Sequence, residues 1–193
     1  VIGSLNMDLV VNVDTMPKPG QTLLGGNFKE VPGGKGANQA VAMARLEGNV
    51  SMIGKVGKDG FGKTLIKALN NDNVNTNHVN IANCSTGVAF ITVDKNAHNA
   101  IVVAPGANFQ LTKDDIDKNI DCIKNSDIVV IQLETPLKTV KYALQVAKGL
   151  NKYTILNPAP AVKLDDEIIG HVDLLTPNET ELEIISEIKI ENE

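Results

Sequence analysis

Short runs of apolar, mostly β-branched residues recur along the chain and alternate with segments of helical periodicity. The apolar runs predict strands at residues 1–2, 50–56, 128–131, 153–156 and 172–175. One intervening helix is marked by apolar residues at i, i+3, i+4 and i+7, namely Val140, Ala143, Leu144 and Ala147. Alternating strands and helices, with strands apolar on both faces, predict an α/β fold with a mostly parallel sheet covered by helices.

A second helix is predicted to begin at Thr112. The Thr112 side chain can cap the first turn, and Asp115 stands where the carboxylate of a capping box is found. Leu111 and Ile116 have the spacing of a hydrophobic staple, and the apolar face continues to Ile123.

Two segments, at residues 9–32 and 86–105, interrupt the alternation. Both are extended, contain turn signals and lack a helical pattern. We therefore expect them to form a small separate sheet, inserted in a single α/β domain that covers residues 1–193.

Composition narrows the kind of ligand. The net charge is -5 and the sequence pI about 5.2, without a run of lysine or arginine. Such a chain lacks the basic surface that nucleic acid or an anionic membrane requires, so we expect a small neutral or anionic ligand. No apolar run approaches the roughly 18 residues of a membrane helix. The only cysteines, Cys84 and Cys122, are far apart in sequence, which favours a reducing, cytoplasmic location.

Polar residues follow the predicted strands, and in open α/β sheets ligands bind beyond the carboxyl ends of the strands. These residues are Asn6, Asp8, Glu134, Asn157 and Asn178. Each alone is also typical of a turn or helix cap. Their occurrence at equivalent positions favours a ligand-binding site at this edge.

A glycine-rich motif at residues 33–39 leads into a predicted helix. Its glycines allow close backbone approach to a ligand, and we expect the free amides of the first helical turn to favour hydroxyl or anionic acceptors. It is not a P-loop, because Gly36 follows Lys35, nor a dinucleotide fingerprint, because Gln39 stands where a small residue is needed. A second cluster, at residues 57–62, is interpreted as a turn with Asp59 near a helix start.

The motifs of this chain resemble, in order and spacing, those of the ribokinase-like family of carbohydrate and nucleoside kinases. They lie at residues 3–8, 33–39, 57–62, 132–134, 157–161 and 176–181. The combination of Gly-Gly-Lys-Gly-Ala-Asn-Gln-Ala with Asn-Pro-Ala-Pro-Ala is most similar to the ribose-phosphorylating members. The resemblance covers essentially the whole chain. It implies a doubly wound sheet with helices on both faces and a β-sheet lid over the sugar.

The same resemblance implies roles for individual residues. Sugar binding is carried over to Asn6, Asp8, Gly34, Lys35, Asn38 and Glu134. Asn178 would bind the nucleotide, and Glu181 would act on Mg²⁺ through water. The resemblance further implies ATP as co-substrate, a monovalent cation such as K⁺, and a homodimer joined through the lid strands.

The family's Gly-Ala-Gly-Asp segment, which supplies the catalytic aspartate, does not occur in this sequence. We expect that aspartate beyond Glu193, so the domain would be incomplete at its C-terminal end and the chain as given inactive. The favoured interpretation is an ATP-dependent kinase that phosphorylates D-ribose at the 5-hydroxyl. Two alternatives stay open: a kinase for fructose, deoxyribose or a nucleoside, and a sugar-binding module without catalysis.

Overall fold

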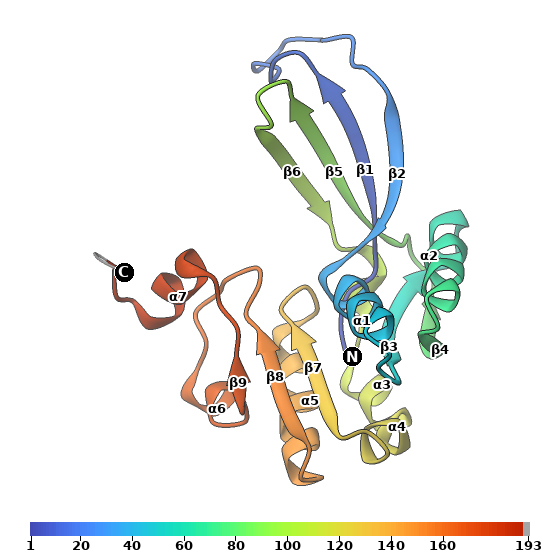
Figure 1. The fold of residues 1–193 in the computed structure, drawn as a ribbon, viewed down its shortest axis with the longest axis vertical. Coiled ribbons are helices and arrows are strands. Elements are labelled where there is room, and N and C mark those ends of the chain that lie inside the picture. The colour runs from blue at the N-terminus through green and yellow to red at the C-terminus, as the bar shows by residue number, and fades with distance from the viewer. Residues whose placement is uncertain (191–193) are drawn as a thin grey trace.

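The body of the protein is a parallel β-sheet in the computed structural model, which describes residues 1–190. β3 (Ser51–Gly57) pairs with β4 (Asn75–Ala82) in parallel. β8 (Tyr153–Asn157) lies between β7 (Ile128–Gln132) and β9 (Leu174–Leu175), again in parallel. Figure 1 shows these strands in the lower part of the molecule.

The start of the chain joins these two groups of strands. Ile2 forms parallel bridges to Ile53 of β3 and to Ile131 of β7. The N–H of Ile2 donates to the Val130 carbonyl over 2.9 Å, and the N–H of Gly3 donates to the Ile53 carbonyl over 3.1 Å. The first predicted strand therefore lies at the centre of the sheet, although its bridges involve a single residue.

One face of the sheet is covered by two helices, α1 (Lys35–Arg45) and α2 (Gly60–Asn71). Met52 and Val56 of β3 point to this side and pack with apolar residues of both helices. Because side chains alternate along a strand, Ile53, which directly follows Met52, points to the opposite face.

Helices from later in the chain cover that opposite face. They are α3 (Lys113–Lys118), α4 (Ile120–Lys124), α5 (Leu137–Gly149) and α6 (Asp166–Ile169). Ile53 belongs to their hydrophobic cluster, together with Val140 and Leu144 of α5. Helices on both faces of a parallel sheet confirm the predicted doubly wound α/β fold.

A second sheet projects from the body (Figure 1) and is called here the projecting sheet. Its strands, in spatial order, are β2 (Phe28–Gly33), β1 (Asn6–Val13), β5 (Gly87–Asp94) and β6 (Asn99–Ala104). β1 runs antiparallel to β2 and parallel to β5, and β5 runs antiparallel to β6. The two segments predicted as extended thus form one sheet. Its first strand begins earlier than predicted, so Asn6 and Asp8 lie within it.

Several elements differ from the sequence-based prediction. β4 was not predicted, because it is an edge strand whose residues are mostly polar and partly exposed. The helix predicted from Thr112 has the expected capping box with Asp115, but Asn119 divides it into α3 and α4. The strand predicted at 172–175 is shorter. No helix within residues 1–190 combines the length and apolar character needed to cross a membrane.

Candidate sugar site at the base of the projecting sheet

Ser4 and Glu134 connect three segments that meet where the projecting sheet joins the body. Ser4 Oγ donates a hydrogen bond to Glu134 Oε2 over 2.5 Å, and the Lys35 N–H donates to the same oxygen over 3.0 Å. The Gly36 N–H donates to Ser4 Oγ over 3.2 Å. Ser4 is fully buried and Glu134 half-buried. These charge-assisted bonds fix the carboxylate and leave Oε1 without a partner in the described chain.

The first turn of α1 does not offer free amides, contrary to the expectation from the glycine-rich motif. Glu134 accepts from the Lys35 N–H, while Ser4 accepts from the N–H groups of Gly36 and Ala37. A helix N-terminus whose amides are already bonded is a weaker binding element for anions. Side chains, rather than helix amides, are left for a ligand.

Gly34 is required by the backbone geometry of the turn from β2 into α1. Its φ is +92°, a region that favours glycine. A Cβ on Gly34 would also lie 2.7 Å from the Asn6 nitrogen and 3.0 Å from the Ser4 carbonyl oxygen. The glycine thus lets the start of α1 pack directly against the start of β1.

Asp8 lies next to Gly33 and within electrostatic reach of Glu134. A Cβ on Gly33 would lie 2.7 Å from the Asp8 Cγ, so the glycine makes room for this carboxyl group. Burial, and after it the negative charge of Glu134, raises the pKa of Asp8 above its ordinary value of 3.8. A carboxyl group whose negative charge is disfavoured by its surroundings is stabilised by a ligand that donates hydrogen bonds to it, such as a polyol.

Asn6 completes this cluster from the start of β1. It is buried, and its Oδ1 accepts a hydrogen bond from Asn108 Nδ2 over 2.7 Å. In the strand register Asn6 lies between Gly33 of β2 and Gly87 of β5. The two glycines make room for the Asp8 carboxyl group on one side and for the bonded amides of Asn6 and Asn108 on the other.

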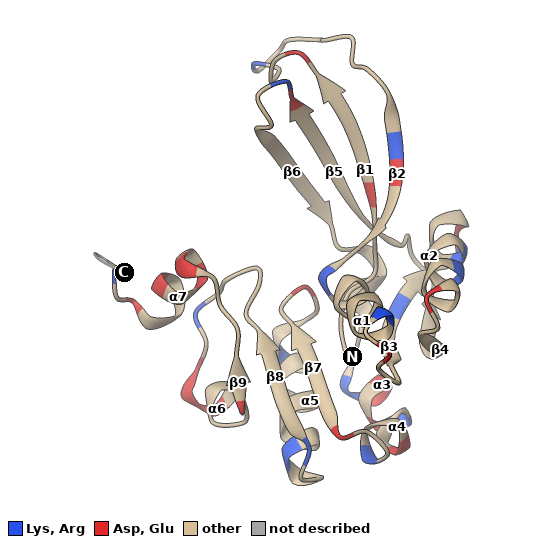
Figure 2. Ribbon diagram, viewed as in Figure 1, with Lys and Arg blue, Asp and Glu red and all other residues tan. Residues whose placement is uncertain are grey.

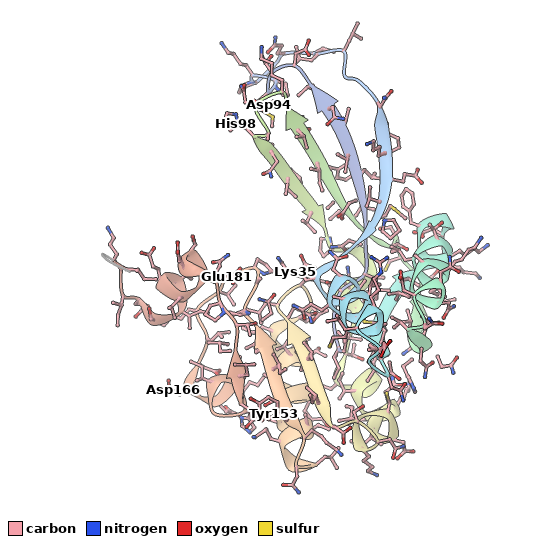
Figure 3. The ribbon with its side chains drawn as sticks, in the orientation of Figure 1. Lys35, Asp94, His98, Tyr153, Asp166 and Glu181 are labelled. Carbon is pink, nitrogen blue, oxygen red and sulfur yellow. The ribbon has the colours of Figure 1, made fainter. Side chains whose placement is uncertain are left out.

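Lys35 and Asn38 occupy the first turn of α1. Figure 3 shows Lys35 at the junction of the body and the projecting sheet, and Figure 2 shows acidic positions on both sides of this junction. Asn38 is exposed and lines a cavity of about 380 Å³ between α1 and α2. Within residues 1–190 no hydrogen bond joins its side chain to Asp8 or Glu134, so its predicted role stays a prediction.

Asn178 and Glu181 form the N-terminal cap of α7 (Glu179–Ser186). The Glu181 N–H donates to Asn178 Oδ1 over 2.7 Å, and the Asn178 N–H donates to Glu181 Oε2 over 2.9 Å. Figure 3 shows Glu181 at the same edge of the body as Lys35, beyond β9. The cap leaves Asn178 Nδ2 and Glu181 Oε1 without partners among the described residues. No described hydrogen bond joins this pair to the Ser4–Glu134 cluster.

The second glycine cluster has the structural role that was predicted for it. Asp59 is the N-cap of α2, and its Oδ1 accepts from the Gly62 N–H over 2.8 Å. The same carboxylate accepts from the Thr86 N–H over 2.7 Å and from Thr86 Oγ1 over 2.6 Å. Asp59 therefore anchors the start of β5 to the body.

Two buried residues of the site were not found from the sequence. Ser4 lies in the motif at residues 3–8, but nothing in its sequence context indicates that it bonds a carboxylate 130 positions later. Asn108 lies 102 positions after Asn6 and follows Gly106, which reads as an ordinary turn. Both residues act through contacts that only the fold creates.

The fold and the site together define a protein of the ribokinase-like class: a doubly wound parallel sheet, a projecting sheet, and acidic and amide side chains at their junction. The chain belongs to the family described as pfkB family carbohydrate kinase, whose family model matches residues 1–193.

Individual relatives agree with this membership. The chain is 44% identical to a ribokinase of Haemophilus influenzae, over 100% of this chain and 63% of that protein. It is 42% identical to a deoxyribokinase of Salmonella typhi, over 99% of this chain and 63% of that protein. The structure of Arabidopsis thaliana ribokinase with ribose and ATP matches with a TM-score of 0.89 and 28% identity, over 99% of this chain and 64% of that one. The chain thus spans somewhat less than two thirds of these relatives.

Proposed function

We propose that these residues are the sugar-binding part of an ATP-dependent kinase that transfers the γ-phosphate to the 5-hydroxyl of D-ribose and yields ribose 5-phosphate. The observation that carries the proposal is that two carboxyl groups and a buried amide meet at the turn into α1, at the base of the projecting sheet. Asp8 lies against Gly33, Asn6 is opposite Gly33 in the strand register, and Glu134 accepts from the Lys35 N–H. The names of the relatives, which include ribokinases and a ribokinase structure with ribose and ATP, support this substrate.

In this proposal the sugar is held by groups of opposite hydrogen-bonding character. Asp8 and Glu134 accept from hydroxyl groups, and Asn6 and Lys35 supply donors from the facing segments. Gly34 keeps the backbone close enough for the sugar to contact the turn. A site built from such groups discriminates by leaving a buried polar atom unpaired whenever a sugar lacks the matching hydroxyl.

The nucleotide phosphates would lie farther along the same edge of the sheet. Asn178 Nδ2 can donate to a phosphate oxygen, and Glu181 Oε1 can contact Mg²⁺ through a water molecule. No group of three or more acidic, histidine or cysteine side chains within residues 1–190 could hold a metal by itself. Mg²⁺ commonly keeps several waters and binds substrate phosphates with one or two carboxylates. Bound Mg²⁺ would neutralise charge on the phosphates. We also propose that the whole protein binds a monovalent cation such as K⁺, which the family resemblance implies.

Phosphoryl transfer also needs a group that takes the proton from the sugar hydroxyl, and stabilisation of the transferring phosphoryl group. The Gly-Ala-Gly-Asp segment that serves this purpose in the family is absent from the sequence. We therefore expect residues 1–193 alone to bind sugar without turnover.

The test is ADP release by the whole natural protein with ribose, 2-deoxyribose, fructose and a nucleoside as acceptors. Ribose is expected to give the highest kcat/KM. The variant Asp8→Ala should lose ribose binding while its circular dichroism spectrum is unchanged. The matched control Asp14→Ala, on an exposed loop at the far end of the projecting sheet, should behave like the wild type. Equal activity with fructose would refute the substrate, and no ADP release with any acceptor would refute the kinase.

A second acceptor, 2-deoxyribose, is supported by the Salmonella typhi deoxyribokinase, whose identity to this chain is close to that of the ribokinases. Deoxyribose lacks one hydroxyl, so the two acceptors differ in the number of polar groups that the site can satisfy. A kcat/KM for deoxyribose at or above that for ribose would decide in favour of this alternative.

The projecting sheet also supports a proposal of homodimerisation. In the strand register, the face that carries Asp8 also carries Val31, Val103 and Ile101, all of them exposed. An apolar sheet face of this kind is stabilised when a second copy covers it, which would also shield the sugar from water. Light scattering of the whole protein should give the mass of a dimer, and Ile101→Asp should shift it to a monomer.

We also propose a cytoplasmic location, because the only two cysteines are unpaired and both remain free thiols in the structure. Fractionation of cells that express the whole protein tests this directly.

A further inference from the structure

Asn108 lies on the short 3-10 helix η1 (Gly106–Gln110), which directly follows the last strand of the projecting sheet. Its side chain is only 1% exposed. A buried amide has lost its contacts with water, so its polar atoms need partners within the protein. Asn108 finds them on Leu5 and Asn6, at the point where β1 leaves the body.

The backbone of Leu5 determines which way the Asn108 amide points. The Leu5 N–H donates to Asn108 Oδ1 over 2.9 Å, and Asn108 Nδ2 donates to the Leu5 carbonyl over 3.1 Å. A backbone N–H can only donate and a carbonyl can only accept, so reversing the amide would place like groups against each other at both positions. The orientation of Asn108 is therefore fixed.

This fixed amide in turn determines the orientation of Asn6. The remaining hydrogen of Asn108 Nδ2 points to Asn6 Oδ1, 2.7 Å away. The Nδ2 of Asn6 must then lie on the other side of its amide group. Within residues 1–190 the Asn6 Nδ2 atom has no hydrogen-bond partner. It is not fully enclosed either, because the fully buried side-chain atoms without a partner in this part of the chain are Gln132 Oε1 and Thr135 Oγ1. Asn6 Nδ2 thus stays accessible to a ligand.

Two glycines make this arrangement possible. A Cβ on Gly87 would overlap both Asn108 Nδ2 and Asn6 Oδ1. Gly106 has a φ of +48°, which turns the chain so that Asn108 reaches the start of β1. The two glycines therefore allow the amides of Asn108 and Asn6 to come within hydrogen-bonding distance of each other.

We infer that Asn108 is a positioning residue of the sugar site, which holds Asn6 so that its NH₂ group, and not its oxygen, faces the ligand. This inference rests on the proposed function. Asn6 then donates to a hydroxyl oxygen, and the neighbouring Asp8 accepts from a hydroxyl hydrogen. A hydroxyl that contacts both residues has both of its hydrogen-bonding roles satisfied.

A double-mutant cycle on the whole protein tests the coupling. Asn108→Ala and Asn6→Ala should each raise the KM for ribose about tenfold, the expected effect of one lost hydrogen bond to the ligand. The combined variant should be no worse than Asn6→Ala alone, with kcat and the KM for ATP little changed. Additive effects in the cycle would overturn the inference, because Asn108 would then act independently of Asn6.

The variant Asn6→Asp tests the polarity directly. It has the shape of asparagine but no donor when ionised, so the KM for ribose should rise at neutral pH. Because the acidic groups Asp8 and Glu134 face the same site, variant and wild type are compared at each pH. The ratio of their KM values should approach one as the pH falls and the introduced carboxyl group gains a proton. A wild-type KM at neutral pH would mean that an oxygen faces the sugar.

Asn119→Ala is the matched control. Asn119 is another buried asparagine, bonded to His78 and to the Asp115 carbonyl away from the site, so its removal should lower stability without changing the KM for ribose. If the wild type phosphorylates no sugar, the proposed function and this inference both fall. If it is active and the cycle is additive, only the inference falls.

Discussion

The most direct test of the site's architecture is Ser4→Ala. The serine hydroxyl is fully buried and makes two hydrogen bonds, donating to Glu134 and accepting from the Gly36 N–H. Alanine removes both bonds and changes little else, because it has almost the same volume. The substitution therefore isolates the connection between the start of the chain, α1 and the loop after β7.

The expected loss can be worked out from these two bonds. A hydrogen bond to a charged group contributes about 1.5–3 kcal/mol, and a buried N–H left unpaired costs about 1–3 kcal/mol. Glu134 keeps its bond from the Lys35 N–H, so part of the first contribution is retained. We expect the free energy of unfolding to fall by about 2–4 kcal/mol.

Urea unfolding of the whole protein, followed by circular dichroism, measures this loss. The control is Ser126→Ala, which removes a half-buried hydroxyl bonded only to the Cys122 carbonyl four residues earlier. That substitution should cost less than about 1 kcal/mol, because the carbonyl is close to water. The KM for ribose should rise for Ser4→Ala alone, since Glu134 becomes less well oriented. Equal losses for the two serines would refute the assigned role of Ser4.

Three further predictions concern stability. The pKa of Asp8 is raised in the folded protein, so its ionisation opposes folding. Asp8→Asn should therefore raise the midpoint of thermal unfolding at pH 7. This gain should shrink as the pH falls towards 3.8, because Asp8 then becomes protonated in both the folded and the unfolded state. Gly34→Ala should destabilise the fold by more than about 1 kcal/mol through its positive φ and the contact with Asn6, whereas Gly149→Ala, with open space around it, should be nearly neutral in thermal unfolding. Lys55→Met should lower the free energy of unfolding in urea by about 3 kcal/mol, because it leaves the buried Asp115 carboxylate without the ammonium group that lies 2.7 Å away. A loss below about 1 kcal/mol would refute that reasoning.

Local signals in the sequence determined much of this protein. Apolar periodicity located the inner strands and α5, and the Thr112 and Asp115 pattern gave the capping box of α3. These features depend on residues close together in the chain, whose preferences act before any long-range contact forms. The glycine-rich motif and its companions likewise indicated the family, which the comparisons confirm.

The tertiary structure alone decided how those elements combine. It paired β1 with β5, so that two extended segments became one sheet with Asn6 and Asp8 inside it. It also used the amides of the first turn of α1 for Ser4 and Glu134, which the motif had suggested were free for a ligand. Hydrogen bonds between residues 32 to 130 positions apart depend on the final packing of the chain, and no local pattern encodes them. The sugar site was therefore recognisable in sequence, whereas the residues that orient it, Ser4 and Asn108, were not.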